Sequence, residues 1–210
     1  NFRVAGNLSY LENELIEYGN DTGWDNLDSF RTAGTVSRAQ NGKPYPYFYG
    51  YKTAGIFQNM DEVAAYINKD GGMIQPNAVP GDVRFVDMNG DGKITTDDCT
   101  DIGKGMPDWT YGLNFNVSWK NFDFSMQWTG AWNVDRMLSE FRRPLGDTNS
   151  KALLLYQYET TWRSSEDTFT AKFPRASNSH ASNNYRGTDL YLINASYLRL
   201  KNVEIGYNFD

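Results

Sequence analysis

A short polar stretch, Asp87 to Asp98 (DMNGDGKITTDD), carries oxygen-bearing side chains at regular intervals. Counted from Asp87, these side chains stand at the first, third, fifth, ninth and twelfth positions, with a glycine at the sixth. This is the spacing of EF-hand loops, in which oxygen ligands surround a calcium ion. The predicted calcium ligands are Asp87, Asn89, Asp91, the backbone carbonyl of Lys93, Thr95 and Asp98.

Two features bear on this prediction. At the twelfth position, Asp98 is shorter than the glutamate that binds calcium with both oxygens in most EF-hands, so we expect weak binding, with a Kd of about 10⁻⁴–10⁻³ M. The preceding residues, PGDVRFVD, have the pattern of an extended chain, so no helix–loop–helix unit is expected. The alternative is a tight turn whose carboxylates accept hydrogen bonds from backbone amides.

Groups for acid–base or nucleophilic catalysis are scarce. His180 is the single histidine, and it stands in a stretch rich in serine and asparagine without a recognisable nucleophile motif. Asp97 and Asp98 are adjacent in the sequence, which does not suit the two carboxylates that flank a sugar bond in glycosidases. Because Cys99 is the only cysteine, no internal disulfide or cysteine-based metal site can form. We therefore predict that the protein is not an enzyme.

Aromatic side chains offer a different chemistry, because their rings stack on the rings of sugars and other ligands. They make up 15% of the chain, and many fall in polar segments. The candidates for substrate contact are Trp24, Tyr45, Tyr47, Tyr49, Trp162 and Tyr185. Each could instead pack inside its own loop. Arg142 and Arg143 could face an anionic substrate or pair with loop carboxylates.

The clearest structural element is a pair of strands between Trp109 and Trp132. Large apolar side chains alternate there with small polar ones on both sides of Lys120-Asn121, which predicts a β-hairpin. Each strand of the hairpin has about 10 residues, the length that spans a bilayer at a tilt. The apolar positions are Leu113, Phe115, Val117, Trp119, Phe122, Phe124, Met126 and Trp128.

The same alternation fits two environments for this apolar face. In a transmembrane barrel the eight side chains face lipid, and Trp119 and Phe122 join an aromatic girdle beside the turn. In a soluble sandwich they pack against a second sheet. The pattern alone does not separate a lipid contact from a protein contact.

Two further strands are expected at residues 2–10 and 191–209. The second one changes phase at Asn202, which predicts a β-bulge, because otherwise its two faces would exchange. The long connections 11–108 and 133–190 are polar. Connections of this length are unusual in a compact sandwich but are common on the outer side of a membrane barrel.

These connections carry some structure of their own. We expect a strand at 47–58 (YFYGYKTAGIFQ) that belongs to the extracellular part rather than to the barrel wall. We also expect a short helix at 61–68 and another at 150–162, with Ser150 as its N-cap. The predicted fold is therefore all-β: an antiparallel transmembrane β-barrel fragment with long extracellular loops that contain short helices.

Composition restricts the partners. The chain has 210 residues, a net charge of −6 and a pI near 4.9, which argues against nucleic acid. Its mean hydropathy is −0.64, and no apolar run approaches the roughly 18 residues of a membrane helix. The abrupt first and last residues suggest a fragment of a longer protein.

Five blocks of sequence, in this order, resemble the C-terminal half of SusC/RagA-type TonB-dependent outer-membrane transporters. The blocks are GYKTAGIFQ, PGDVRFVDMNGDGKITTDD, IGKGMPDWTYGLNFNVSWKNFDFSMQWTGAW, FPRAS and NASYLRLKNVEIGY. They span roughly residues 50–209, and the PGD–NGDG run followed by YLRLKNVEIGY is the most specific combination. The first fifty residues fit this family more loosely.

The resemblance implies a barrel of about 22 strands in the outer membrane of a Gram-negative bacterium. Residues 1–210 are then the C-terminal part of the barrel domain, without the plug and the final strands, and 11–108 and 133–190 are extracellular. The implied partners are a SusD-like surface lipoprotein, TonB through a segment outside this chain, and membrane lipid. The implied function is import of glycan fragments or peptides. The alternative from the residues alone is a secreted, calcium-stabilised, β-rich glycan-binding module.

Overall fold

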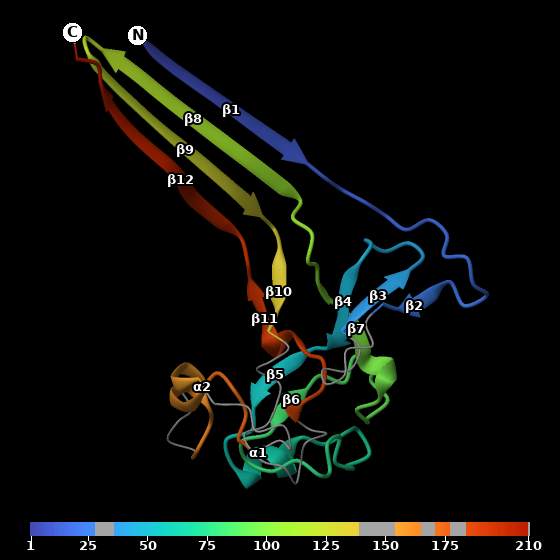
Figure 1. The fold of residues 1–210 in the computed structure, drawn as a ribbon. Coiled ribbons are helices and arrows are strands. Elements are labelled where there is room, and N and C mark those ends of the chain that lie inside the picture. The colour runs from blue at the N-terminus through green and yellow to red at the C-terminus, as the bar shows by residue number, and fades with distance from the viewer. Residues whose placement is uncertain (28–35, 139–153, 165–170, 177–183, 210) are drawn as a thin grey trace.

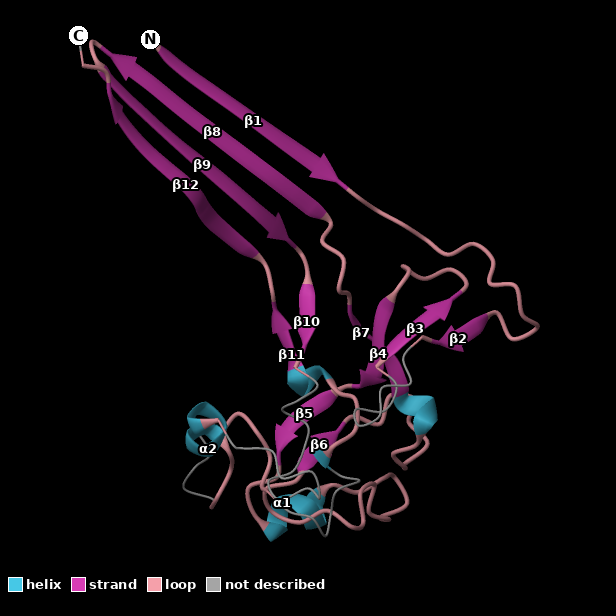
Figure 2. Ribbon diagram, in the orientation of Figure 1, coloured by secondary structure: helices cyan, strands magenta, loops and turns pink. Residues whose placement is uncertain are grey.

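The computed structural model describes residues 1–27, 36–138, 154–164, 171–176 and 184–209. Its strands pair in the antiparallel sense, and its helices are short (Figure 2). The strands form one long sheet and several small ones, and the long sheet does not close on itself within the described residues. The predicted antiparallel all-β class is confirmed.

The long sheet has the strand order β1-β8-β9-β12. Its strands are β1 (Phe2–Tyr10), β8 (Trp109–Trp119), β9 (Phe122–Trp132) and β12 (Tyr197–Tyr207). Figure 1 shows this sheet, here called the arm, projecting from the remaining elements, here called the loop region. Both chain ends and the β8–β9 turn lie at the far end of the arm. Both long connections, 11–108 and 133–190, leave from its other end.

The pairing register gives the arm one apolar and one polar face, because directly opposed residues point to the same side of a sheet. The pairs in the β8–β9 hairpin are Leu113–Trp128, Phe115–Met126, Val117–Phe124 and Trp119–Phe122. All eight apolar positions predicted from the sequence therefore share one face. Between them, polar pairs such as Asn114–Gln127 lie on the opposite face.

The ladder between β9 and β12 contains one irregularity, between Leu200 and Asn202. These two residues pair with adjacent residues of β9, so Lys201 is left out of the register. Beyond this bulge, Val203 and Ile205 return to the apolar face. The bulge predicted at Asn202 is confirmed, and it keeps the two faces of β12 distinct.

The loop region contains three small antiparallel sheets. The first has the order β2-β3-β4-β7, with β2 (Trp24–Asn26), β3 (Ser37–Gln40), β4 (Tyr47–Tyr51) and β7 (Cys99–Gly103). The others pair β5 (Thr53–Ile56) with β6 (Val83–Phe85), and β10 (Asp135–Met137) with β11 (Leu192–Asn194). The last pair extends the direction of β9 and β12 towards the loop region (Figure 1).

Residues 47–58, expected as one strand, form two strands, β4 and β5, in different sheets. Neither strand pairs with the arm, which agrees with their expected place outside the barrel wall. The chain passes from β4 to β5 at Lys52, and within β4 Gly50 crosses close to Gly187. A Cβ at position 50 would lie 2.4 Å from the carbonyl oxygen of Gly187, so only glycine fits this crossing.

The described helices are shorter than predicted. Helix α1 (Met60–Ala65) lies largely within 61–68 and is capped by Asn59, whose side chain accepts the amide N–H of Glu62. Helix α2 (Leu155–Thr160) has Leu154 at its N-cap position. The predicted cap, Ser150, lies outside the described residues, and the helix predicted from residue 150 is described only from residue 155.

The buried apolar side chains of the described residues gather in the loop region. One cluster contains Tyr51, Val83 and Phe85, and a second contains Phe57, Val63 and Ala78. In the arm, by contrast, Ala131 is the one apolar side chain among the described residues that is buried. No helix among the described residues is long and apolar enough to cross a membrane. The core of this chain therefore belongs to the loop region, and the arm has a bare apolar face.

Candidate functional site

The first half of the 87–98 loop is held by its own side chains. The carboxylate of Asp87 accepts the amide N–H groups of Gly90 at 2.7 Å and Gly92 at 2.8 Å. The side-chain oxygen of Asn89 accepts the amide N–H of Asp91 at 2.9 Å. Gly90 and Gly92 have φ angles of 74° and 82°, in the left-handed region that favours glycine. The DxNGDG pattern thus specifies a tight, self-capped turn.

Asp98 closes the second half of the loop. It is fully buried, and its carboxylate accepts the amide N–H groups of Met88 at 2.8 Å and Thr95 at 2.7 Å, with a longer contact to Asn89 at 3.4 Å. Thr95 in turn caps the short 3₁₀ helix η1 (Thr96–Asp98). The approach to the loop is strand β6, so the expected absence of an entering helix agrees with the structure.

The fit of this loop to calcium is mixed. A carboxylate has about four lone-pair positions, and Asp98 already uses three of them on backbone amides. Asp87 and Asp91 keep more capacity for an ion. Among the described residues, no group of three or more His, Cys, Asp or Glu side chains is arranged to hold a metal. The geometry matches the capped turn, and calcium binding stays a prediction.

The predicted substrate-contacting aromatics do not gather at one place. Trp24 and Tyr49 lie in one small sheet and hold Arg38 between them, with its guanidinium carbon 4.1 Å and 3.3 Å from the two ring centroids. Tyr47 is buried, and its hydroxyl donates to Gln40 at 2.6 Å. In this structure the Tyr47 ring packs inside its own sheet, and its contact with substrate stays a prediction.

The remaining predicted contacts are scattered over the loop region. Tyr45 is about half exposed, with its amide bonded to Asn13, whereas Trp162 lies next to α2. Tyr185 is partly buried. Arg142, Arg143 and His180 lie outside the described residues, so the structure does not place them.

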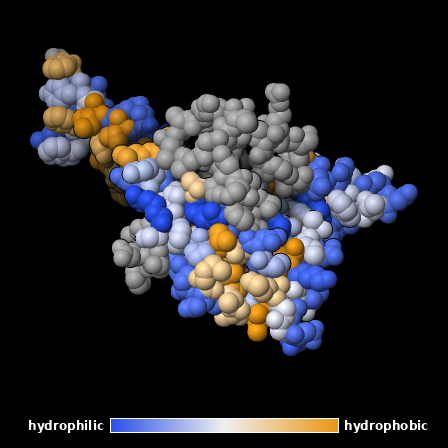
Figure 3. Space-filling model, turned by 90° about the horizontal axis from the view of Figure 1, so that it is seen from below, coloured by the Kyte–Doolittle hydropathy of each residue, from blue (hydrophilic) through white to orange (hydrophobic). Residues whose placement is uncertain are grey.

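The apolar face of the arm is exposed along its length. None of its eight predicted lipid-facing side chains is buried, and Trp119, Phe122 and Leu113 are 65%, 50% and 44% exposed. Figure 3, viewed from the loop region, shows apolar side chains along the projecting arm. No second layer of the described chain covers this face, as a sandwich would require.

Aromatic side chains form a row at each end of this face. The row next to the loop region contains Tyr10, Trp109, Tyr111 and Trp132, and the row at the turn contains Trp119, Phe122 and Tyr207. Ring contacts of 4.7 Å (Tyr10–Trp109) and 4.8 Å (Phe122–Tyr207) link neighbouring strands within the rows. Ten residues separate the rows, about 33 Å along a strand or about 23 Å across a bilayer at a 45° tilt.

The arm joins the loop region through a set of contacts centred on Asp108, here called the rim junction (Leu11, Lys104, Asp108, Asn133 and Ser196). The Leu11 amide donates to the carbonyl of Asp108 at 2.8 Å, and Lys104 and Asn133 bond its carboxylate. The Asn133 amide donates to Ser196 at 3.1 Å. The hydrogen bond from Lys104 lowers the pKa of Asp108. Residues next to all four arm strands thus meet at one point.

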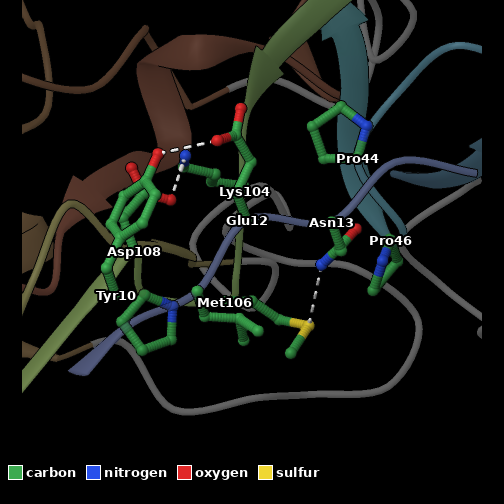
Figure 4. A pocket seen from close by; sticks show the side chains of 10 residues that line it. Tyr10, Glu12, Asn13, Pro44, Pro46, Lys104, Met106 and Asp108 are labelled. Carbon is green, nitrogen blue, oxygen red and sulfur yellow. Dashed lines mark hydrogen bonds and ion pairs between the residues drawn. The ribbon is translucent and has the colours of Figure 1, made fainter.

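A cavity of about 220 Å³ lies beside the rim junction. Figure 4 shows Asp108 and Tyr10 on one side of it and Asn13, Pro44 and Pro46 on the other. The Tyr10 hydroxyl donates to Glu12 at 3.0 Å. The cavity is lined by three segments of the chain, at residues 10–13, 44–46 and 104–108.

The PGD and FPRAS blocks, far apart in the sequence, meet at a buried ion pair. Arg175 donates to the fully buried carboxylate of Asp82 at 2.7 Å, and Asn184 donates to the same oxygen at 3.0 Å. Gly81 next to it packs against Trp162, and a Cβ there would lie 2.3 Å from that ring. These motif residues hold the loop region together.

No family model matches the chain. Among curated proteins, it is 29% identical over 212 residues to TonB-dependent receptor P3 of Formosa agariphila, with 98% of this chain and 19% of that protein covered. It is 26% identical over 208 residues to TonB-dependent receptor SusC of Bacteroides thetaiotaomicron, with 99% and 18% covered. The chain therefore spans about a fifth of the length of these relatives.

Solved structures agree with these sequence relatives. The RagAB peptide importer in its closed-closed state aligns with a TM-score of 0.63 and 18% identity, over 99% of this chain and 20% of that chain. The open-open state gives a TM-score of 0.62 with 17% identity. This likeness confirms the predicted fold as a segment of an antiparallel barrel with large loops on one side.

Proposed function

The chain is related to the SusC/RagA-type TonB-dependent transporters, and we propose that it forms part of the wall and the outer loops of such a transporter in the outer membrane of a Gram-negative bacterium. The arm supplies four strands of the wall, and the loop region lies on the extracellular side. The remaining wall strands and the plug would be supplied by parts of the protein outside these 210 residues.

The observation that carries this proposal is the apolar face of the arm. It is continuous across four strands, exposed, and bounded at both ends by aromatic rows about 23 Å apart across a tilted sheet. Outer-membrane barrels have an apolar band about 25 Å tall between two aromatic girdles. A soluble protein would leave this face in water at a large hydrophobic cost.

The opposite face supports the same placement. Polar side chains there, such as Asn114, Asn116 and Gln127, would line the interior of the barrel, which is polar in proteins of this kind. The rim junction would then stand where the wall leaves the outer surface of the membrane. The open edges of β1 and β12 would pair with neighbouring wall strands, because bare strand edges are not stable on their own.

The cargo and the partners belong to this proposal as well. The chain is similar to SusC, which is named a TonB-dependent receptor, and to RagAB, which is named a peptide importer. We propose import of glycan fragments or peptides, with TonB as the energy-coupling partner and a SusD-like surface lipoprotein as the lid. The protein would bind and pass its cargo rather than transform it.

Fractionation of cells that express the full-length protein tests this proposal. We expect the protein in the outer-membrane fraction, extractable by detergent and not by alkaline carbonate. A periplasmic protein and a known outer-membrane porin serve as fractionation controls. Recovery of the full-length protein from the soluble or secreted fraction would overturn the proposal and favour the secreted, calcium-stabilised glycan-binding module instead.

A further inference from the structure

Cationic side chains gather on one part of the loop region, although the chain as a whole has a net charge of −6. They border two neighbouring cavities between α2, β5 and the segment that leads to Arg175. We call this the basic surface and define it by Arg84, Arg163, Lys172 and Arg175. None of the sequence motifs predicted it, because its members come from three separate segments.

The first cavity, of about 580 Å³, has Arg84 and Lys172 in its lining. Arg84 donates to the backbone carbonyl of Ala54 at 2.7 Å and lies over the Phe57 ring at 5.8 Å. Lys172 lies over the Tyr156 ring at 5.5 Å. Within the described residues neither cation has a carboxylate at ion-pair distance, and Glu62, the carboxylate in the same lining, accepts the amide N–H of Gln58 at 3.0 Å.

The second cavity, of about 400 Å³, combines two guanidinium groups with two aromatic rings, Tyr158 and Trp162. Arg163 is exposed and lies over the Tyr158 ring at 4.9 Å. Arg175 is fixed by its ion pair with Asp82. The site therefore has one exposed guanidinium and one that is fixed by an ion pair, both beside the two rings.

The two cavities are connected through one hydrogen bond. The indole N–H of Trp162, in the second cavity, donates at 2.8 Å to the side-chain oxygen of Gln58, in the first. The Trp162 ring is also fixed by its contact with Gly81. The ring and the cations are thus held in place before any ligand arrives, which lowers the entropy cost of binding.

From this arrangement we propose that the basic surface binds the anionic part of the transported cargo, namely the carboxylate groups of a short oligomer. This inference rests on the proposed transport function and specifies its substrate class. Both volumes fall within the range of about 300–1,000 Å³ that is usual for ligand sites. The guanidinium groups would bind carboxylates, and the rings of Tyr158 and Trp162 would stack on the adjoining sugar or side chain.

The carboxylates could come from an acidic oligosaccharide or from an acidic peptide, and the experiment separates these sources. Purified full-length transporter in detergent is titrated calorimetrically with tetragalacturonate, with tetraglutamate and with the neutral maltotetraose. We expect one of the two acidic ligands to bind, with an affinity that falls as salt is raised, and maltotetraose to bind at least tenfold more weakly. The acidic ligand that binds identifies the source.

Two exposed members of the basic surface are then altered. Arg163→Gln and Lys172→Gln should each weaken binding of the acidic ligand about two- to fivefold, as expected for solvent-accessible charge pairs. Lys69→Gln, an exposed lysine that borders neither cavity, is the matched control and should leave affinity unchanged.

Three results would overturn the inference: no binding of either acidic ligand, equal binding of maltotetraose, or equal affinity of both cavity variants and wild type. Each can occur in a protein that fractionates with the outer membrane. Failure of the substrate assignment is therefore distinguishable from failure of the proposed transport function.

Discussion

Placing an arginine on the apolar face of the arm tests whether that face meets lipid. Met126 pairs with Phe115 and Val203, and it lies four residues from Phe122 in the aromatic row at the turn. Four residues correspond to about 13 Å along the strand and about 9 Å of depth at a 45° tilt. This position is therefore near the middle of an apolar band about 25 Å tall.

The cost of the substitution should depend on depth. Met126→Arg should lower the free energy of unfolding from a bilayer by about 2–4 kcal/mol, the cost of a cation near the midplane. Phe124→Arg, at a depth of only about 5 Å from the same row, should cost less, since the side chain can reach the interface. Gln127→Arg, on the polar face next to Met126, is the matched control and should cost little.

The assay is denaturant-induced unfolding of the full-length protein from lipid vesicles, followed by tryptophan fluorescence. A lipid-facing arm requires the order Met126→Arg, then Phe124→Arg, then Gln127→Arg, from the largest loss of stability to the smallest. Equal losses for Met126→Arg and Gln127→Arg would refute the reasoning, because only lipid on one side distinguishes the two faces. A larger loss at Phe124 than at Met126 would refute the assigned depth.

Three further predictions concern single sites. Millimolar calcium added to the full-length protein should give a calorimetric signal with a Kd of about 10⁻⁴–10⁻³ M that Asp87→Asn removes, and no heat above the buffer blank would leave only the capped turn. Gly130→Ala would place a Cβ 2.3 Å from the Tyr111 ring and should destabilise the arm by about 1–3 kcal/mol, measured by unfolding from vesicles. Gly206→Ala, with no neighbour closer than 3.7 Å, is the control and should cost less. Equal losses of stability in the two variants would contradict the close contact. The pKa of the Asp108 carboxylate is lowered below its ordinary value of 3.8, so its contribution to stability is present above that value and is lost as pH falls through the lower folded value. Asp108→Asn should therefore reduce the fall in the free energy of unfolding between neutral and acidic pH. An unchanged fall would contradict this prediction.

Much of the arm was predictable because its signals are local. Alternation of side chains with a period of two is a property of successive residues, and it marks a strand and its two faces without any partner. The turn at Lys120 and the bulge at Asn202 follow from the same pattern, since a change of phase must be absorbed in the register. The tight turn at Gly90 and Gly92 was likewise predictable, because the sequence pattern of such a turn is local.

The sequence pattern was less informative where the structure of a segment depends on residues far away in the chain. Tyr47 lies in a polar segment, as a surface aromatic would, but β3 and β7 flank its strand and its ring is buried. The predicted strand 47–58 divides into two because its first part pairs with β7 and its second part with β6, which are separate segments further along the chain. Helix α2 is described from Leu155 to Thr160, inside the predicted range 150–162, and residues 150–153 lie outside the described part of the chain.

The sequence by itself determined which residues form the strands of the arm, which faces of those strands are apolar, and which family the motifs resemble, because each of these is encoded in short-range order. Only the tertiary structure decided that Asp82 and Arg175 form a buried pair, that residues beside all four arm strands meet around Asp108, and that Arg163 and Lys172 share a surface with Arg84. Such sites arise when the chain brings separated charges together, and the energy that does so comes from burial and pairing across the whole fold rather than from any local pattern.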